Sequence, residues 1–158
     1  MKVAITFIGT NKYLNFLPQY HENITKYFLP NTEKVFLVFT DGDGDFPRDV
    51  KYYHQPHLEW PFITLKRFEI INKARDVIDE CDWLVFIDAD ALPVTTITEE
   101  EFFKDKPLFG VHHPCHFLGM EPHTKAPGAY EQNPKCEAYV DVSQSLPPVY
   151  WQGCLWGG

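Results

Sequence analysis

The sequence predicts an α/β protein with a Rossmann-like architecture, in which helices cover both faces of a mixed, mostly parallel sheet. Two observations support this fold class. Largely apolar runs occur within residues 3–8, 34–40 and 83–90, which is typical of parallel strands buried on both faces. Between them, apolar residues recur at three- and four-residue spacing, which indicates amphipathic helices. Strands that alternate with helices favour a parallel sheet.

The first half of the chain predicts two strands separated by a helix. Residues 3–8 form the first strand, which ends at Gly9, and residues 34–40 form the second, which runs into a DGDGDFP loop. The intervening helix is expected to break or kink at Pro18 and to stop at Pro30, because proline disrupts the helix interior. Its apolar positions are Tyr13, Leu14, Phe16, Leu17, Tyr20, Ile24, Tyr27 and Phe28.

The second half begins with a short segment at 50–54 and a long helix near 63–81. The inner face of that helix consists of Leu65, Phe68, Ile71, Ala74 and Ile78. A strand at 83–90, an acidic helix start at 98–101 and a strand at 107–113 follow. Residues 119–148 are rich in proline, glycine and polar residues, which indicates a long functional loop. The last segment, VYWQGCLWGG, is apolar and punctuated by glycine.

Length and charge restrict the function. With 158 residues the chain has the size of one domain. Its 14 basic and 22 acidic residues give a net charge of -8, which disfavours a nucleic-acid partner because phosphate backbones need a basic face. A small phosphate ligand remains compatible with this charge if a metal ion meets the phosphates.

Cysteine use and hydropathy predict a soluble cytoplasmic protein. The four cysteines, Cys81, Cys115, Cys136 and Cys154, form no CxxC pair and are expected to be reduced thiols. The apolar N-terminus is short and no cleavage site follows it. No segment reaches the roughly 20 apolar residues that span a membrane, so neither a membrane partner nor a signal peptide is expected.

Two metal-site interpretations are weak. The DGDGD run at 41–45 resembles a calcium loop, but Phe46 and Tyr52 occupy the positions that require glycine and a bidentate glutamate. We interpret the run as a solvated turn. His112, His113 and His116 lack the spacing of a helical zinc motif. One of these histidines is better explained as a hydrogen-bonding group for a polar ligand.

Asp88 and Asp90 are the strongest chemical signal. They end the apolar run WLVFIDAD, and ionised carboxylates are costly at the end of a buried strand unless a cation meets them. Residues two apart on a strand share a face, so both carboxylates can converge on one oxygen-seeking cation, manganese or magnesium. The pair Lys66-Arg67 lies nearby in sequence and can meet phosphates. The alternative is a capped turn with two solvated aspartates.

A phosphatase is an alternative function that would explain the same DxD motif. Haloacid-dehalogenase phosphatases also end a strand in DxD, but they continue with threonine or valine at the fifth position. This chain has Leu92 there, followed by Pro93, which disfavours that function.

Several segments in order resemble glycosyltransferase family 6, which includes the histo-blood-group A and B transferases and the α-1,3-galactosyltransferases. They are FIGTNKYLNFL, VFLVFTD, WPFITLKRFEII, DWLVFIDAD, GVHHPCHF, CEAYV and VYWQGCLWGG. The resemblance covers nearly the whole chain and implies a GT-A fold. It also implies one domain over 1–158, with a nucleotide-binding part at 1–90 and an acceptor-side part at 91–158.

The resemblance implies specific site residues. Tyr13 matches a tyrosine that stacks on uracil, with Phe7 or Ile8 in the same nucleotide pocket, and Arg67 matches a basic residue near the donor diphosphate. Asp88 and Asp90 match the metal-binding DxD motif. The full nucleotide-sugar set is Phe7, Ile8, Tyr13, Ile63, Arg67, Asp88, Asp90, Gly153 and Cys154. His113 and Gln152 are the implied acceptor-side residues, and 152–154 is the segment that selects the donor sugar.

The implied activity is metal-dependent, retaining transfer of galactose or N-acetylgalactosamine from a UDP-sugar to the 3-hydroxyl of a galactose-containing oligosaccharide. The family's glutamate nucleophile or stabiliser would follow Gly158, so we expect a chain truncated at its C-terminus, with no catalytic residue inside it and little or no transferase activity. Two alternatives remain open: a GT-A transferase of another family, and a catalytically silent sugar-binding module. An apolar strand exposed at the C-terminal end would also permit a homo-oligomer.

Overall fold

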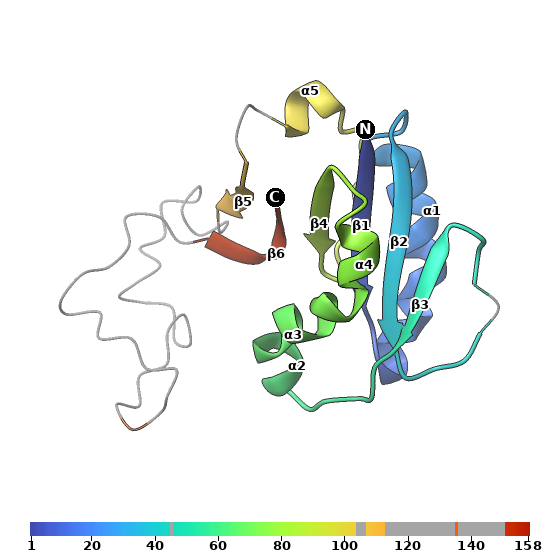
Figure 1. The fold of residues 1–158 in the computed structure, drawn as a ribbon, viewed down its shortest axis with the longest axis vertical. Coiled ribbons are helices and arrows are strands. Elements are labelled where there is room, and N and C mark those ends of the chain that lie inside the picture. The colour runs from blue at the N-terminus through green and yellow to red at the C-terminus, as the bar shows by residue number, and fades with distance from the viewer. Residues whose placement is uncertain (45, 104–106, 113–134, 136–150) are drawn as a thin grey trace. The chain divides into compact units, whose positions relative to one another are not determined.

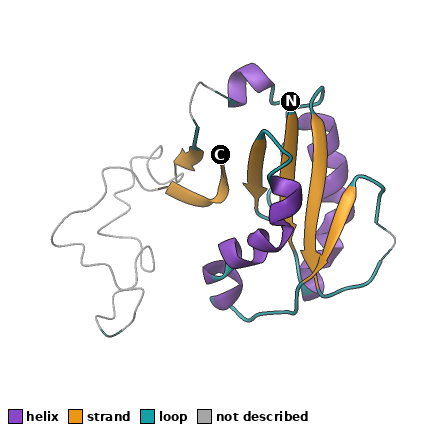
Figure 2. Cartoon of the chain, in the orientation of Figure 1, coloured by secondary structure: helices purple, strands orange, loops and turns teal. Residues whose placement is uncertain are grey.

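The computed structural model describes residues 1–44, 46–103, 107–112, 135 and 151–158. These residues form a six-stranded sheet with the order β3-β2-β1-β4-β6-β5 (Figures 1 and 2). The neighbours β1–β2, β2–β3 and β1–β4 are parallel, whereas β6 runs antiparallel to β4. The predicted α/β fold with a mostly parallel sheet is therefore confirmed. The strands are β1 (Lys2–Ile8), β2 (Glu33–Thr40), β3 (Val50–His54), β4 (Trp83–Ile87), β5 (Phe109–His112) and β6 (Trp151–Gly157).

The chain divides into two compact units, residues 1–109 with 154–158, and residues 110–153. Within the second unit the structure describes residues 110–112, 135 and 151–153. The predicted loop at 119–148 and the histidines at 113 and 116 lie outside the described residues, apart from Lys135. The candidate site belongs to the first unit.

Helices cover the two faces of the sheet in the first unit (Figure 1). Side chains alternate along each strand, so Val3, Ile5 and Phe7 of β1 pack with α1 (Leu17–Tyr27), whereas Ala4 packs on the opposite face. That second face meets a helical run made of α2 (Phe62–Leu65), α3 (Arg67–Ile71), η2 (Asn72–Ala74) and α4 (Arg75–Ile78).

Two predicted helices differ from the structure. The helix predicted from Tyr13 begins as a 3-10 helix, η1 (Asn11–Phe16), and becomes α1 at Leu17. Pro18 does not kink it, because proline in the first helical turn lacks only an amide hydrogen that would have no partner there. The single helix predicted at 63–81 is wrong, because the chain leaves helical geometry at Lys66 (φ -90°, ψ 9°) and Ala74 (φ -102°, ψ 21°). Its predicted inner face is also wrong at Leu65 and Phe68, which are 62% and 69% exposed.

The observed bounds of three shorter elements also differ from the predicted ones. Strand β4 ends at Ile87, not at Asp90, and β5 covers Phe109–His112 of the predicted 107–113. The acidic segment forms α5 (Glu99–Phe102), where the Thr98 hydroxyl accepts from the Glu101 amide. No helix in the described part of the chain has both the length and the apolar character needed to cross a membrane.

Tyr20 joins the helix layer to the sheet below the site. Its side chain is fully buried and its ring meets Phe7 edge-on at 5.0 Å. Its hydroxyl donates to the carbonyl oxygens of Thr6 at 3.0 Å and Ile87 at 3.4 Å. Burial, and then the nearby Asp88 charge, raise the pKa of Tyr20, so the hydroxyl stays protonated and remains a donor.

Tyr20→Phe is expected to lower the free energy of unfolding by about 1–2 kcal/mol, because two buried carbonyl oxygens lose a hydrogen-bond donor. Urea denaturation measures the change. The matched control is Tyr52→Phe, since Tyr52 is exposed and its hydroxyl lies 3.3 Å from His54 Nδ1, its one hydrogen-bond partner among the described residues. Equal unfolding midpoints for the two variants would contradict this role of Tyr20.

Candidate functional site

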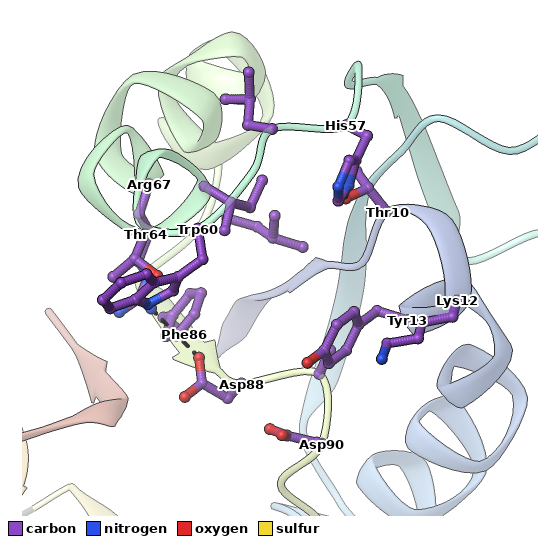
Figure 3. Close-up of a pocket in the computed structure, with 14 residues that line it drawn as sticks. Thr10, Lys12, Tyr13, His57, Trp60, Thr64, Arg67, Phe86, Asp88 and Asp90 are labelled. Carbon is purple, nitrogen blue, oxygen red and sulfur yellow. Dashed lines mark hydrogen bonds and ion pairs between the residues drawn. The ribbon is translucent and has the colours of Figure 1, made fainter.

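A pocket of about 400 Å³ opens at the carboxyl ends of β1 and β4 (Figure 3). In open α/β sheets this edge, where the strand order reverses, is the usual ligand position. Here β2 and β3 lie on one side of β1, whereas β4 lies on the other. The lining residues are Ile8, Thr10, Lys12, Tyr13, His57, Leu58, Trp60, Ile63, Thr64, Arg67, Phe86, Asp88, Ala89 and Asp90.

The two aspartates line this pocket from a turn. Strand β4 ends at Ile87, and the Ala91 amide donates to the Asp88 carbonyl oxygen at 2.9 Å. On the other side, the Asp88 amide donates to the Cys154 carbonyl oxygen of β6 at 2.8 Å. The two carboxylates thus reach one pocket as predicted, but strand alternation is not the reason, since the strand has already ended.

Asp88 and Arg67 form an ion pair at the edge of the pocket. Arg67 Nη2 lies 3.4 Å from Asp88 Oδ1, and the two side chains are 15% and 34% exposed. Burial raises the pKa of Asp88; Arg67 lowers that pKa and Asp90 raises it further. Burial lowers the pKa of Arg67, which the Asp88 charge partly restores. The net rise for Asp88 means that Arg67 does not fully compensate its burial, so a further cation would be favourable there.

An aromatic stack fixes the position of Arg67. Its guanidinium lies 4.1 Å from the centroid of the Phe86 ring. Phe86 in turn stacks on Trp156 at 5.1 Å with an interplanar angle of 13°. A cation held over an aromatic face is stabilised by the ring quadrupole. Residues from α3, β4 and β6 therefore act together to hold one positive charge beside Asp88.

Tyr13 forms the opposite wall of the pocket, as Figure 3 shows. It lies on η1, whose first residue, Asn11, has a φ of 54° and donates its amide hydrogen to Asp41 Oδ1 at 2.7 Å. Asparagine tolerates this left-handed conformation. The Tyr13 ring is 42% exposed and is held edge-on by Phe16 at 5.8 Å, so one of its faces is available to a flat ligand.

A polar pair lies on the pocket wall beyond Tyr13. Thr10 Oγ1 and His57 Nδ1 are 2.9 Å apart, within hydrogen-bonding distance. Thr10 follows β1 and is only 4% exposed, whereas His57 comes from the segment between β3 and α2 and is exposed. Figure 3 shows the pair at one end of the pocket and Asp88 with Asp90 at the other.

The chemistry of the aspartate pair fits a hard divalent cation. Carboxylate oxygens are the ligands that magnesium and manganese prefer, and such sites often use one or two carboxylates with the substrate's phosphates. Among the residues that the structure describes, no group of three or more His, Cys, Asp or Glu side chains forms a potential metal site. From the described part of the chain, Asp88 and Asp90 are the residues that could hold such a cation.

Most predicted nucleotide-side residues lie together. Ile8, Tyr13, Ile63, Arg67, Asp88 and Asp90 all line the pocket. Of the alternatives Phe7 and Ile8, Phe7 does not line it, because its ring is fully buried against α1.

The remaining predicted residues come from the C-terminal part. Cys154 has a free, half-buried thiol, and its backbone carbonyl oxygen accepts the hydrogen bond from the Asp88 amide. Burial, and then the nearby Asp88 charge, raise the pKa of the thiol. Gly153 is an exposed residue of β6. The Gln152 side chain and all of His113 lie outside what the structure describes, so their acceptor-side roles stay predictions.

The sequence did not single out several lining residues, chiefly Thr10, His57, Trp60 and Phe86. Thr10 had a detectable signal, because it follows the first predicted strand and so lies at the edge where such sheets bind ligands. Trp60 opens the segment WPFITLKRFEII of the family resemblance but was not assigned a role. His57 had no signal, because it lies in a segment without periodicity and reaches the pocket through the tertiary fold.

Comparison with known proteins found a matching family and a relative. The model of glycosyltransferase family 6 matches residues 1–158, the whole chain. The O-antigen biosynthesis glycosyltransferase WbnI of Escherichia coli is 27% identical over 161 residues, covering 100% of this chain and 66% of that relative. The chain therefore spans about two thirds of the length of this relative.

Proposed function

Because the chain belongs to glycosyltransferase family 6, we propose that it serves the transfer of galactose or N-acetylgalactosamine from a UDP-sugar to the 3-hydroxyl of a galactose-containing acceptor. The transfer retains the configuration at the anomeric carbon. Membership of this family excludes the alternative of a GT-A transferase from another family.

One observation supports this proposal above the others. Tyr13, Arg67, Asp88 and Asp90 come from three different parts of the chain, yet they line the same pocket. An aromatic platform, a fixed positive charge and two carboxylates are the groups that a base, a diphosphate and its counter-cation require. A phosphatase would need no aromatic platform for a base.

Each group has a distinct role in the proposed reaction. Tyr13 would stack on the uracil ring, and Arg67 would donate hydrogen bonds to the diphosphate. When the bond between the sugar and the diphosphate breaks, negative charge develops on the leaving group. A preorganised cation stabilises such charge more in the transition state than in the ground state. The stack on Phe86 supplies that preorganisation for Arg67.

Asp88 and Asp90 are the residues that would hold manganese or magnesium, which supplies Lewis-acid stabilisation of the departing diphosphate. Without a bound cation, the ionised Asp88 would repel the phosphates, and Arg67 and Lys12 are the basic residues of the described pocket lining that would oppose that repulsion. Tight nucleotide binding by this pocket should therefore require the cation.

Calorimetric titration of UDP with manganese, and again with chelator, tests the proposal. We expect binding with manganese and at least about tenfold weaker binding with chelator, a difference of roughly 1.4 kcal/mol. Release of UDP from UDP-galactose and UDP-N-acetylgalactosamine then distinguishes the two donors. A folded sample that binds no UDP under either condition would refute the proposal. Binding without any turnover of donor or acceptor would support the silent sugar-binding module instead.

A further inference from the structure

We propose that His57, oriented by Thr10, reads the edge of the nucleotide base and makes the pocket select uracil over cytosine. This inference rests on the proposed function and adds the base selectivity of the same site. It is carried by a pair of side chains that line the pocket but take no part in the roles described above.

The pocket has two chemically different ends (Figure 3). Asp88, Asp90 and Arg67 supply charge at one end, whereas Thr10 and His57 are at the other and Tyr13 stands between them. A nucleoside diphosphate has the same polarity, with charged phosphates at one end and a flat base at the other. Charge therefore directs the phosphates to Arg67 and the cation, which leaves the base beside Tyr13 and the Thr10–His57 pair.

The hydrogen bond between Thr10 and His57 determines where the imidazole proton lies. Thr10 is 4% exposed, and a buried hydroxyl needs an acceptor for its hydrogen. Within the described part of the chain, His57 Nδ1 at 2.9 Å is the acceptor available to it. Nδ1 therefore accepts from the Thr10 hydroxyl, and the neutral ring carries its hydrogen on Nε2.

A histidine with hydrogen on Nε2 presents a donor to the pocket. Uracil has a carbonyl oxygen at C4, which accepts this hydrogen bond, whereas cytosine has an amino group at C4, which is itself a donor. Placing two donors against each other leaves both without an acceptor, which costs more than a missing contact. His57 is exposed in the free protein, so an incoming base can reach it.

The test is calorimetric titration of UDP and CDP, both with manganese, into the wild type and three variants. We expect the wild type to bind UDP about tenfold more tightly than CDP, the effect of roughly one hydrogen bond. His57→Ala should bring the two affinities within about twofold while it still binds UDP. Thr10→Val, which removes only the orienting hydroxyl, should also reduce the ratio, whereas Thr10→Ser should retain it. His54→Ala is the matched control, since that exposed histidine does not line the pocket.

Each outcome decides a different point. Loss of selectivity in His57→Ala with retention in His54→Ala would support the inference. Unchanged selectivity in His57→Ala, or equal affinity of the wild type for UDP and CDP, would overturn it and leave the proposed function intact. An equal loss of both nucleotides in His57→Ala would also overturn it, because His57 would then support binding without selecting the base. Failure of the folded wild type to bind either nucleotide would overturn the proposed function as well.

Discussion

Replacing Asp90 by asparagine is expected to weaken manganese-dependent UDP binding by roughly 100-fold or more. Loss of a group that merely orients a metal ligand costs about 10–100-fold in affinity, so loss of a ligand carboxylate should reach at least the upper limit. The fold should survive, because Asp90 is exposed at the pocket. Calorimetry at fixed manganese measures the affinity, and thermal unfolding checks the fold.

Asp79→Asn is the matched control for this prediction. Asp79 is also an exposed aspartate, paired with Arg75 at 2.6 Å on the helical run outside the pocket, and an exposed pair of this kind contributes little to stability. Its UDP affinity should equal that of the wild type. If Asp90→Asn and Asp88→Asn both bound UDP as tightly as Asp79→Asn, the carboxylates would not hold the cation, and Arg67 and Lys12 would be the remaining groups for the diphosphate.

The largest loss of stability is expected from Gly157→Ala in β6. A Cβ atom at this position would overlap the Leu84 carbonyl oxygen and the Phe109 ring. The carbonyl cannot move aside, because Gly157 is the register partner of Val85 in the β4–β6 ladder and the Gly158 amide donates to the same oxygen. We expect a loss of about 3 kcal/mol in the free energy of unfolding, as for overpacking in a rigid site.

Urea denaturation compares this variant with Gly44→Ala. There the added Cβ would lie 3.6 Å from the nearest atom, on the Phe46 ring, which is an ordinary contact distance. The control should therefore change stability by less than about 0.5 kcal/mol, as surface substitutions usually do. A Gly157→Ala protein as stable as the control would show that β6 does not dock on β4 as closely as the structure has it.

The parallel strands were predictable because a strand buried on both faces has a nearly continuous apolar sequence. Residues Val3 to Phe7 of β1 are all buried, between one parallel neighbour on each side, so Thr6 is the one polar residue in that run. No feature of the sequence of β6 indicates that it runs antiparallel to its neighbour. This direction is set by pairing with β4, which lies far upstream in the chain.

The broken helical run at 62–78 shows what periodicity misses. One residue outside helical geometry, Lys66 or Ala74, redirects the axis but leaves the apolar spacing almost unchanged. Of the predicted inner face, Ile71 and Ala74 are buried, whereas Leu65 and Phe68 are exposed. A hydrophobic pattern does not record whether the backbone is one continuous helix, and for this reason it does not always identify the residues that face the core.

The pocket residues were predictable where a residue of a chemically distinctive type directly follows a predicted strand. Asp88 and Asp90 follow a strand, and the family resemblance pointed to Tyr13 and Arg67, which line the same pocket. His57 was not predictable, because its relation to Thr10 is created by the tertiary fold across a sequence separation of 47 residues.

The hydrogen bond from the Asp88 amide to the Cys154 carbonyl oxygen has a consequence for how the protein is made. On the ribosome, β1, β2, β3 and β4 emerge first and can assemble by parallel pairing. One edge of β4 then stays open until residues 88–150 have been synthesised and β6 arrives. Such long-range pairing is slow and leaves an exposed strand edge in the nascent chain. The turn that carries both aspartates therefore acquires its final support late, so the pocket should mature after the sheet that holds it.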